Sequence, residues 1–228
     1  MSFIDSNGAR NAQTVAYMDA GQISGHRVLR NTYMLLSMTL LFSAFTAGMS
    51  MMLNLPHPGG LITLAVYFGL LFATTKLRNS AWGLVSVFAL TGFLGMTLGP
   101  VINFYLHTRG GGTVVMGALG LTAVIFMGLS AYVLVTKRDF SFMGGFLSVG
   151  VLVIFVVSLA AMFLQIPSLT LAISAGFVLL MSGMILYETS EIIHGGETNY
   201  IMATVSLYVT IFNLFVSLLN LLGGSNRD

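Results

Sequence analysis

Residues 113–136 read TVVMGALGLTAVIFMGLSAYVLVT, a stretch without a single charged side chain. Arg109 precedes it, and Lys137 and Arg138 follow it directly. A helix needs about 20 consecutive apolar residues to cross the hydrocarbon core of a bilayer. The stretch therefore predicts a membrane-spanning helix that ends where the charged residues begin.

The composition of the whole chain supports the same interpretation. Of its 228 residues, 56% are hydrophobic and only 7% are charged, against about 25% charged in an ordinary soluble domain. So few charged side chains cannot cover the surface of a water-soluble fold, which excludes a soluble globular enzyme and a nucleic-acid-binding tail. The absence of cysteine excludes a disulfide framework and a thiolate metal site.

Six further apolar runs of similar length predict an all-α, polytopic membrane protein with seven transmembrane helices. Charged residues, glycines or prolines separate the runs. The predicted spans are residues 32–55, 59–75, 81–106, 113–136, 141–164, 167–187 and 199–222. The chain then divides into an N-terminal tail, residues 1–30, which we expect to be disordered, and a transmembrane domain, residues 31–224.

The basic residues predict the orientation of these spans. Seven of the nine Lys and Arg side chains lie in the tail and in the connections that follow the second and fourth spans. Because basic residues accumulate in cytoplasmic connections, we expect a cytoplasmic N-terminus. Seven spans then place the C-terminus on the opposite side of the membrane.

Polar side chains form one stripe along the seventh predicted span, where they recur every three or four residues. The stripe consists of Ser206, Thr210, Asn213, Ser217 and Asn220. Polar groups that face lipid are costly, so the stripe should face the bundle interior or a wet cavity. We therefore expect the other six helices to enclose the seventh. A ladder of hydrogen bonds between helices, with no role in transport, is the alternative explanation.

The most unusual polar patch is YETSEIIHGGE at residues 187–197, between the last two spans. Gly195 and Gly196 should end a helix there, and a hairpin would place Ser206 opposite Glu188. A carboxylate at that depth loses hydration, so Glu188 would titrate near neutral pH and act as a latch that responds to protons or cations. The alternative is a hydrated glutamate at a helix end.

Three further side chains of this patch, Glu191, His194 and Glu197, are predicted to form an acidic cytoplasmic loop. Glu191 and His194 have the Glu-x-x-His spacing of di-iron helical bundles. Such sites need a second pair, and the remaining acidic residues are all aspartates outside the predicted spans. We therefore expect no metal site and no cofactor. The spans also lack the buried groups of an intramembrane peptidase, so we expect no enzyme.

Several ordered motifs resemble the Bax inhibitor-1 family of seven-helix membrane proteins. They are GFLGMTLGP at residues 92–100, KRDFSFMGG at 137–145, YETS at 187–190, and SLY and NLF between residues 206 and 215. The segments VLRNTY at 28–33 and IHGGETNY at 193–200 resemble a bacterial branch of that family. The similarity runs from about Val28 to the C-terminus.

The resemblance implies a fold in which six helices surround the seventh, and a bacterial inner membrane as the location, with a periplasmic C-terminus. It implies a non-enzymatic protein that binds and modulates the membrane-anchored AAA+ protease FtsH and is itself degraded slowly. The partners would be this protease and the lipid bilayer, and no nucleic acid.

The alternative that the resemblance implies is a pH-sensitive leak for calcium, with calcium ions or protons as partners. In that mechanism two acidic residues on the last two helices share a proton. The first falls on Glu188 and the second on Thr210, which cannot ionise. Lys76 and Arg78 are the nearest candidates for a basic latch partner. The missing acid favours the protease modulator.

Overall fold

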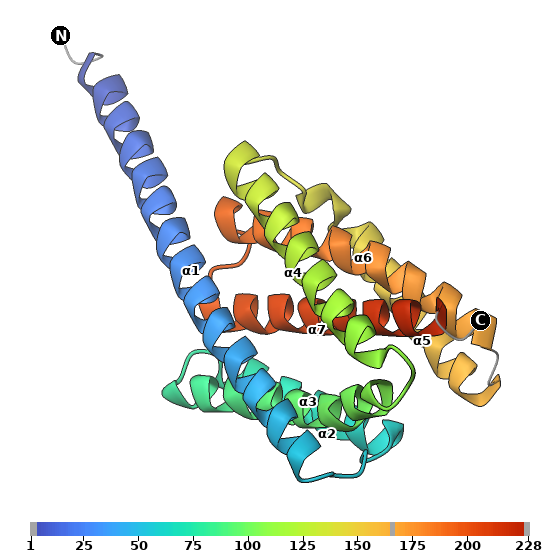
Figure 1. The fold of residues 1–228 in the computed structure, drawn as a ribbon. Helices are drawn as coiled ribbons and strands as arrows, with labels where there is room; N and C mark the ends of the chain where they lie inside the picture. Colours follow the sequence, from blue (N-terminus) through green and yellow to red (C-terminus); the bar gives the residue numbers. More distant parts are fainter. Residues whose placement is uncertain (1–3, 165–166, 226–228) are drawn as a thin grey trace.

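The computed structural model describes the backbone of residues 4–164 and 167–225, and the side chains of residues 27–161 and 169–224. Seven long helices and one 3-10 turn follow one another along the chain (Figure 1). They are α1 (Ile4–Met52), α2 (Gly60–Leu77), α3 (Ala81–Leu106), α4 (Gly111–Thr136), η1 (Ser141–Met143), α5 (Gly144–Leu164), α6 (Pro167–His194) and α7 (Tyr200–Ser225).

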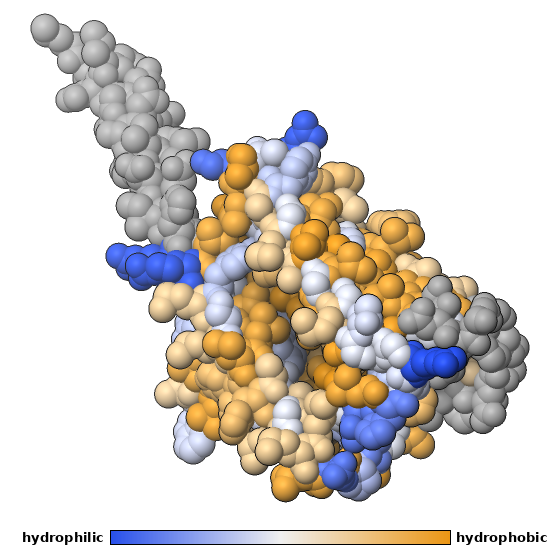
Figure 2. All heavy atoms as spheres, in the orientation of Figure 1, coloured by the Kyte–Doolittle hydropathy of each residue, from blue (hydrophilic) through white to orange (hydrophobic). Residues whose placement is uncertain are grey.

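All seven helices are long and apolar enough to cross a membrane, which confirms the predicted all-α fold class and the number of spans. Apolar residues cover most of the face of the bundle shown in Figure 2, whereas strongly hydrophilic residues gather near its two ends. This is the pattern of a protein whose middle lies in hydrocarbon and whose ends lie in water.

Helix α1 is longer than a membrane span requires. Its membrane-spanning part is Arg27–Met52, and the helical backbone begins at Ile4. At about 1.5 Å per residue, residues 4–26 add about 35 Å of helix, which extends away from the bundle (Figure 1). The disorder of residues 1–30 in water and the division of the chain at residue 31 remain predictions.

Helices α1 and α3 pack closely because glycines line the face that α3 turns toward α1. A β-carbon on Gly95 would overlap the carbonyl oxygen of Ser43, and one on Gly99 would overlap the side chain of Ser50. The short distance also lets the Ser50 hydroxyl donate a hydrogen bond to the Met96 carbonyl oxygen, at 2.8 Å. Small residues have this effect in membrane bundles in general.

Helix α7 lies among α1, α3, α4 and α6, against each of which it packs. In its most apolar part 56% of the residues are buried, against 6% in α2 and in α5. Helix α2 packs mainly against α3, and α5 mainly against α6. The enclosure of α7 by all six other helices therefore remains a prediction, although α7 is the most buried helix of the seven.

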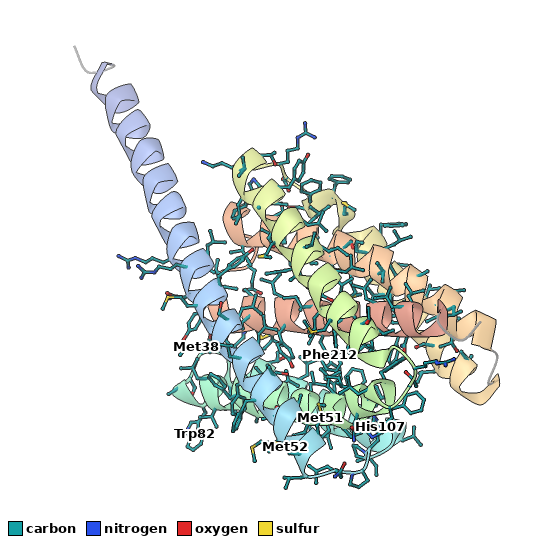
Figure 3. The ribbon with its side chains drawn as sticks, viewed as in Figure 1. Met38, Met51, Met52, Trp82, His107 and Phe212 are labelled. Atoms are coloured by element: carbon teal, nitrogen blue, oxygen red, sulfur yellow. The ribbon has the colours of Figure 1, made fainter. Side chains whose placement is uncertain are left out.

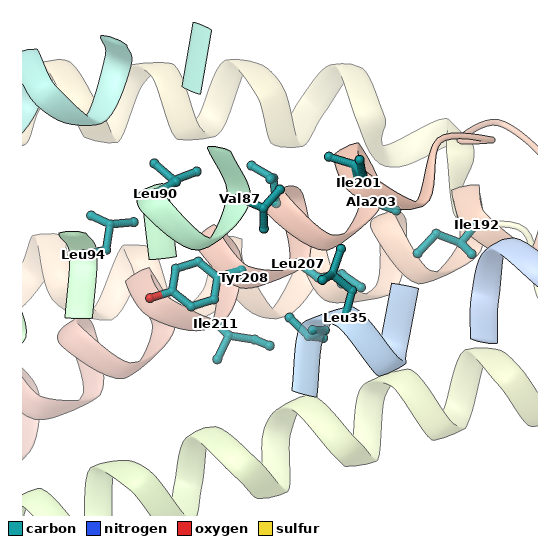
Figure 4. Close-up of a cluster of buried hydrophobic side chains, with 12 residues drawn as sticks. Leu35, Val87, Leu90, Leu94, Ile192, Ile201, Ala203, Leu207, Tyr208 and Ile211 are labelled. Carbon is teal, nitrogen blue, oxygen red and sulfur yellow. The ribbon is translucent and has the colours of Figure 1, made fainter. Parts of the chain in front are cut away.

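One tyrosine of α7 links three helices in the middle of the bundle. The hydroxyl group of Tyr208 lies 2.6 Å from the Ser43 hydroxyl of α1 and donates to the Thr91 carbonyl oxygen of α3, at 3.2 Å. Apolar side chains such as Leu90 and Leu207 surround its ring (Figure 4). A buried phenol needs such partners, because an unpaired hydroxyl in an apolar interior is costly.

Candidate functional site between helices α6 and α7

The site is built on the tight hairpin that joins α6 to α7. Helix α6 ends because Gly195 adopts a left-handed conformation, with φ +82°. The amide groups of Gly196 and Glu197 then donate to the carbonyl oxygen of Glu191, at 2.9 and 3.2 Å. These bonds satisfy a carbonyl that the helix end would leave free.

Helix α7 begins with an N-cap that also fixes a neighbouring connection. The Asn199 side-chain oxygen accepts hydrogen bonds from the amides of Ile201 and Met202, at 3.0 and 3.1 Å. The side-chain nitrogen Nδ2 of Asn199 donates to the Arg78 carbonyl oxygen at 3.2 Å and to the Asn79 side-chain oxygen at 2.9 Å. The hairpin is therefore attached to the connection between α2 and α3.

Helix α6 extends beyond the predicted sixth membrane span. The predicted sixth span ends at residue 187, whereas the helix continues to His194, directly before the helix stop predicted at Gly195 and Gly196. Glu191 and His194 consequently lie in the last turns of α6, and only Glu197 lies in the connection. The apolar run ends before the helix does because polar residues dominate the last turns of α6.

The carboxyl group of Glu188 forms the centre of the site. Its side chain is 6% exposed, and its Oε1 atom accepts hydrogen bonds from Ser206 Oγ at 2.6 Å and from Thr210 Oγ1 at 3.0 Å. The Oε2 atom is buried and, within the described part of the chain, has no hydrogen-bond partner. Two hydroxyl donors supply no charge, so only a proton or a cation can neutralise this carboxylate.

A cavity of about 320 Å³ opens beside Glu188. Its walls carry two further carboxylates, Glu191 and Glu197, both half-buried. Glu191 lies against the α-carbon of Gly196, and Glu197 accepts a hydrogen bond from the Asn199 amide at 2.7 Å. Among the described residues, no group of three or more His, Asp or Glu side chains is arranged to hold a metal ion. The cavity therefore combines negative charge with a buried acid at its wall.

His194 contacts the connection between α4 and α5 instead of the cavity. Its Nε2 atom lies 3.2 Å from the Lys137 carbonyl oxygen, and its Nδ1 atom lies 2.9 Å from the Ser190 carbonyl oxygen. Ser190 Oγ in turn accepts a hydrogen bond from the Phe140 amide at 2.9 Å. Sequence reasoning missed this contact. Its only signal was that the motifs at 137–145 and 187–190 belong to one family pattern.

Asp139 stabilises the same connection from outside the membrane-spanning segments. Its Oδ1 atom accepts hydrogen bonds from the hydroxyl group of Ser141 at 2.5 Å and from the Ser141 amide at 2.8 Å. These bonds, together with the nearby His194 ring, hold the pKa of Asp139 below its ordinary value. Asp139 is therefore ionised at neutral pH, next to the basic residues Lys137 and Arg138.

The structure does not bring the two basic latch candidates to Glu188. Lys76 Nζ lies 5.2 Å from the centre of the Phe72 ring on its own helix, and Arg78 contacts Asn199 through its carbonyl oxygen. Within the described residues neither cation forms an ion pair with Glu188. The reason is that α2 packs against α3, whereas Glu188 lies on α6.

The polar stripe of α7 divides between two places. Ser206 and Thr210 contact Glu188, while Asn213 donates to the Val209 carbonyl oxygen at 2.9 Å and lines a second cavity of about 270 Å³. That cavity lies between α5, α6 and α7, and its polar lining comprises Ser158, Thr170, Ser174, Asn213, Ser217 and Asn220. The stripe thus meets one polar cavity near each end of α7.

Together, these features define the class: a polytopic helical membrane protein with a buried acid at the junction of its last two helices. Residues 25–227 match the family described as inhibitor of apoptosis-promoting Bax1. The chain belongs to this family, the Bax inhibitor-1 family, which confirms the resemblance found in the sequence.

The relatives include proteins from several bacteria. The chain is 57% identical over 206 residues to the modulator of FtsH protease YccA of Escherichia coli, covering 90% of this chain and 94% of that protein. It is 55% identical over 213 residues to an uncharacterised protein of Pseudomonas aeruginosa, covering 93% and 95%. A YccA of another E. coli strain, also 57% identical over 206 residues (90% and 94%), is named an inner membrane protein.

Proposed function

We propose that this chain is a non-enzymatic protein of the bacterial inner membrane that binds and restrains an FtsH-type membrane protease. The observation that carries the proposal is the likeness to the modulator of FtsH protease, 57% identical over 90% of this chain. Identity at this level along nearly the whole length supports a shared partner.

The surface that we assign to the protease is the end of the bundle that holds the N-terminal side of α1 and the connections at 78–80, 137–140 and 195–199. Alternating passes through the membrane bring these segments to one side, and the contacts of Asn199 with Arg78 and of His194 with Lys137 support this grouping. By the distribution of basic residues this side is cytoplasmic, where an AAA+ ring would meet it.

The proposal extends to slow degradation of the chain by the same protease. Residues 4–26 span about 35 Å as a helix, and residues 1–27 reach about 90 Å when extended, enough to enter the pore of a membrane-anchored ring. Seven apolar helices that pack on one another must then be pulled from the bilayer one after another. A substrate that engages easily and is extracted slowly would occupy the protease and restrain it.

Affinity purification from native membranes tests the binding. We expect the protease to co-purify with the tagged chain, and co-purification to fall strongly when residues 2–24 are deleted. Replacement of the same residues by a Gly/Ser segment of equal length separates the sequence of the tail from its reach. If the protease fails to co-purify with the intact chain while that chain is folded and abundant, the proposed function is wrong.

The cation leak is the second candidate, and one observation favours it. Glu188 is buried, its Oε2 atom has no partner among the described residues, and it lies between an acidic cavity and the polar stripe of α7. The feature that weakens it is Thr210, which donates a hydrogen bond where a second acid would be needed.

A further inference from the structure

A recess in the membrane-spanning part of the bundle lies between α1 and α4, with α7 at its base. Both helices pack against α7, but they contribute little packing to each other, and in Figure 1 both cross in front of α7. The recess has a volume of about 530 Å³ and draws its walls from α1, α3, α4 and α7. Met51 and Phe212, which Figure 3 labels, belong to its lining.

The lining is apolar, and none of its side-chain hydroxyl groups is free to bind a ligand. Its three hydroxyl-bearing residues all have partners: Ser43 and Tyr208 lie 2.6 Å apart, and Thr122 donates to the Ala118 carbonyl oxygen at 2.7 Å. On the α1 side the lining includes the small residues Ala44, Ala47 and Gly48, which leave space for an occupant. An occupant that matches this surface is apolar and narrow.

The length of the recess identifies the occupant more closely. Along α1 the lining runs from Leu40 to Met51, a rise of about 17 Å, and Met51 is the last residue but one of α1. The hydrocarbon of one leaflet is about 15 Å thick, half of the bilayer core. The recess therefore runs from the membrane surface on the side where α1 ends to about the middle of the bilayer.

The other end of the recess is closed by aromatic rings. Tyr33 of α1 stacks on Phe126 of α4, with ring centres 6.1 Å apart, and Phe126 also lines the recess. A partner's transmembrane helix needs about 30 Å of length and is about 10 Å wide, so it cannot lie in a space that is closed at mid-membrane.

We propose that this recess binds one acyl chain of a membrane phospholipid, which enters from the leaflet on the side where α1 ends. In a bilayer, lipid acyl chains surround the membrane-spanning part of a protein, so they are the molecules that can enter an apolar recess open to the lipid. The bound chain fills the space between α1 and α4 and contacts Phe212 of α7. This binding site is independent of the protease and of the Glu188 carboxyl group.

Gly48 offers a clean variant for the test. A β-carbon on Gly48 meets no atom within 4 Å, so Gly48→Phe fills the recess without a clash at the backbone. Gly128 of α4 has equally free surroundings and does not line the recess, so Gly128→Phe is the matched control. Ala123→Phe, on the opposite wall, serves as a second filling variant if Gly48→Phe does not fold.

The experiment reconstitutes the purified full-length chain in phosphatidylethanolamine bilayers with a phospholipid that carries a photoreactive diazirine in its acyl chain. We expect labelling to concentrate on residues 40–51 and 119–127, to fall several-fold in Gly48→Phe and to persist in Gly128→Phe. In native mass spectrometry we expect one retained phospholipid on the wild-type chain and on Gly128→Phe, and much less on Gly48→Phe. Even labelling of all lipid-facing helices, labelling unchanged by both filling variants, or cross-links to a second copy of the chain would overturn the proposal.

Discussion

The carboxyl group of Glu188 is the point where the polar stripe of α7 meets the end of α6. Its Oε1 atom holds both helices together through Ser206 and Thr210. Hydrogen bonds to a charged group contribute more than neutral ones, and a buried acceptor that loses its donor is costly. The site therefore contributes to stability whether or not it conducts an ion.

Replacement of one donor tests this contribution. Thr210→Val keeps the shape of the side chain and removes its hydrogen bond to Glu188, so we expect a loss of about 1–2 kcal/mol in the free energy of unfolding. Thr75→Val is the control, because the exposed Thr75 hydroxyl donates to a carbonyl oxygen of its own helix, that of Leu71, and the change should alter stability by less than about 0.5 kcal/mol. Unfolding in detergent measures both. Equal effects of the two variants would contradict the account.

Calcium flux into vesicles tests the second candidate function. We expect weak or no pH-dependent flux for the wild-type chain, because one carboxylate alone cannot share a proton with a second. Thr210→Asp places a second carboxyl group beside Glu188, and two such groups at hydrogen-bond distance do not both ionise readily. This variant should gain pH-dependent flux in the mildly acidic to neutral range.

The double variant is the control for that flux. Adding Glu188→Gln to Thr210→Asp removes one member of the pair, so the pH dependence should disappear again. Steep pH-dependent flux of the wild-type chain between about pH 6 and 8 would instead place the leak ahead of the protease modulator.

At the scale of single helices, the ends were harder to predict than the middles. The uncharged stretch at 113–136 has almost the same bounds as α4, Gly111–Thr136, because hydropathy alone determines such a span. The end of α6 falls at the glycines that predict a helix stop, whereas the contact of His194 with the connection at 137–140 joins segments that lie far apart in sequence. Patterns within one segment carry no information about such contacts.

The interface between α1 and α3 gives a prediction at this scale. Gly95→Leu would push α1 away from α3, and we expect a loss of about 3 kcal/mol or more in the free energy of unfolding. Gly69→Leu in α2 is the matched control, because a β-carbon on Gly69 meets no atom within 4 Å. Thermal unfolding in detergent compares the two variants, and a Gly95→Leu protein as stable as the wild type would show that the close packing is unimportant.

At the scale of the whole molecule, the sequence predicts seven spans and a buried polar stripe but not how the helices are arranged. The proximity of Glu188 to Ser206 follows from a short hairpin, so the sequence could predict it. The separation of Lys76 from Glu188 and the recess between α1 and α4 depend on which helices become neighbours. That choice rests on the fit of many side chains, such as the glycines of α3 against α1.

In the proposed function, different parts of the bundle have different roles. The core around Tyr208 and the close packing of α1 on α3 resist extraction from the membrane. In the proposed function, the long N-terminal part of α1 and the connections on the same side are the parts that would meet the protease. Neither part requires a chemical reaction at the Glu188 site.

Degradation of a membrane substrate by a reconstituted FtsH-type protease, with and without this chain in the same vesicles, tests the central claim most directly. The account predicts that equimolar chain slows degradation of the substrate and that deletion of residues 2–24 removes most of this effect. A rate of substrate degradation that does not change over a wide range of concentrations of the folded chain would contradict it.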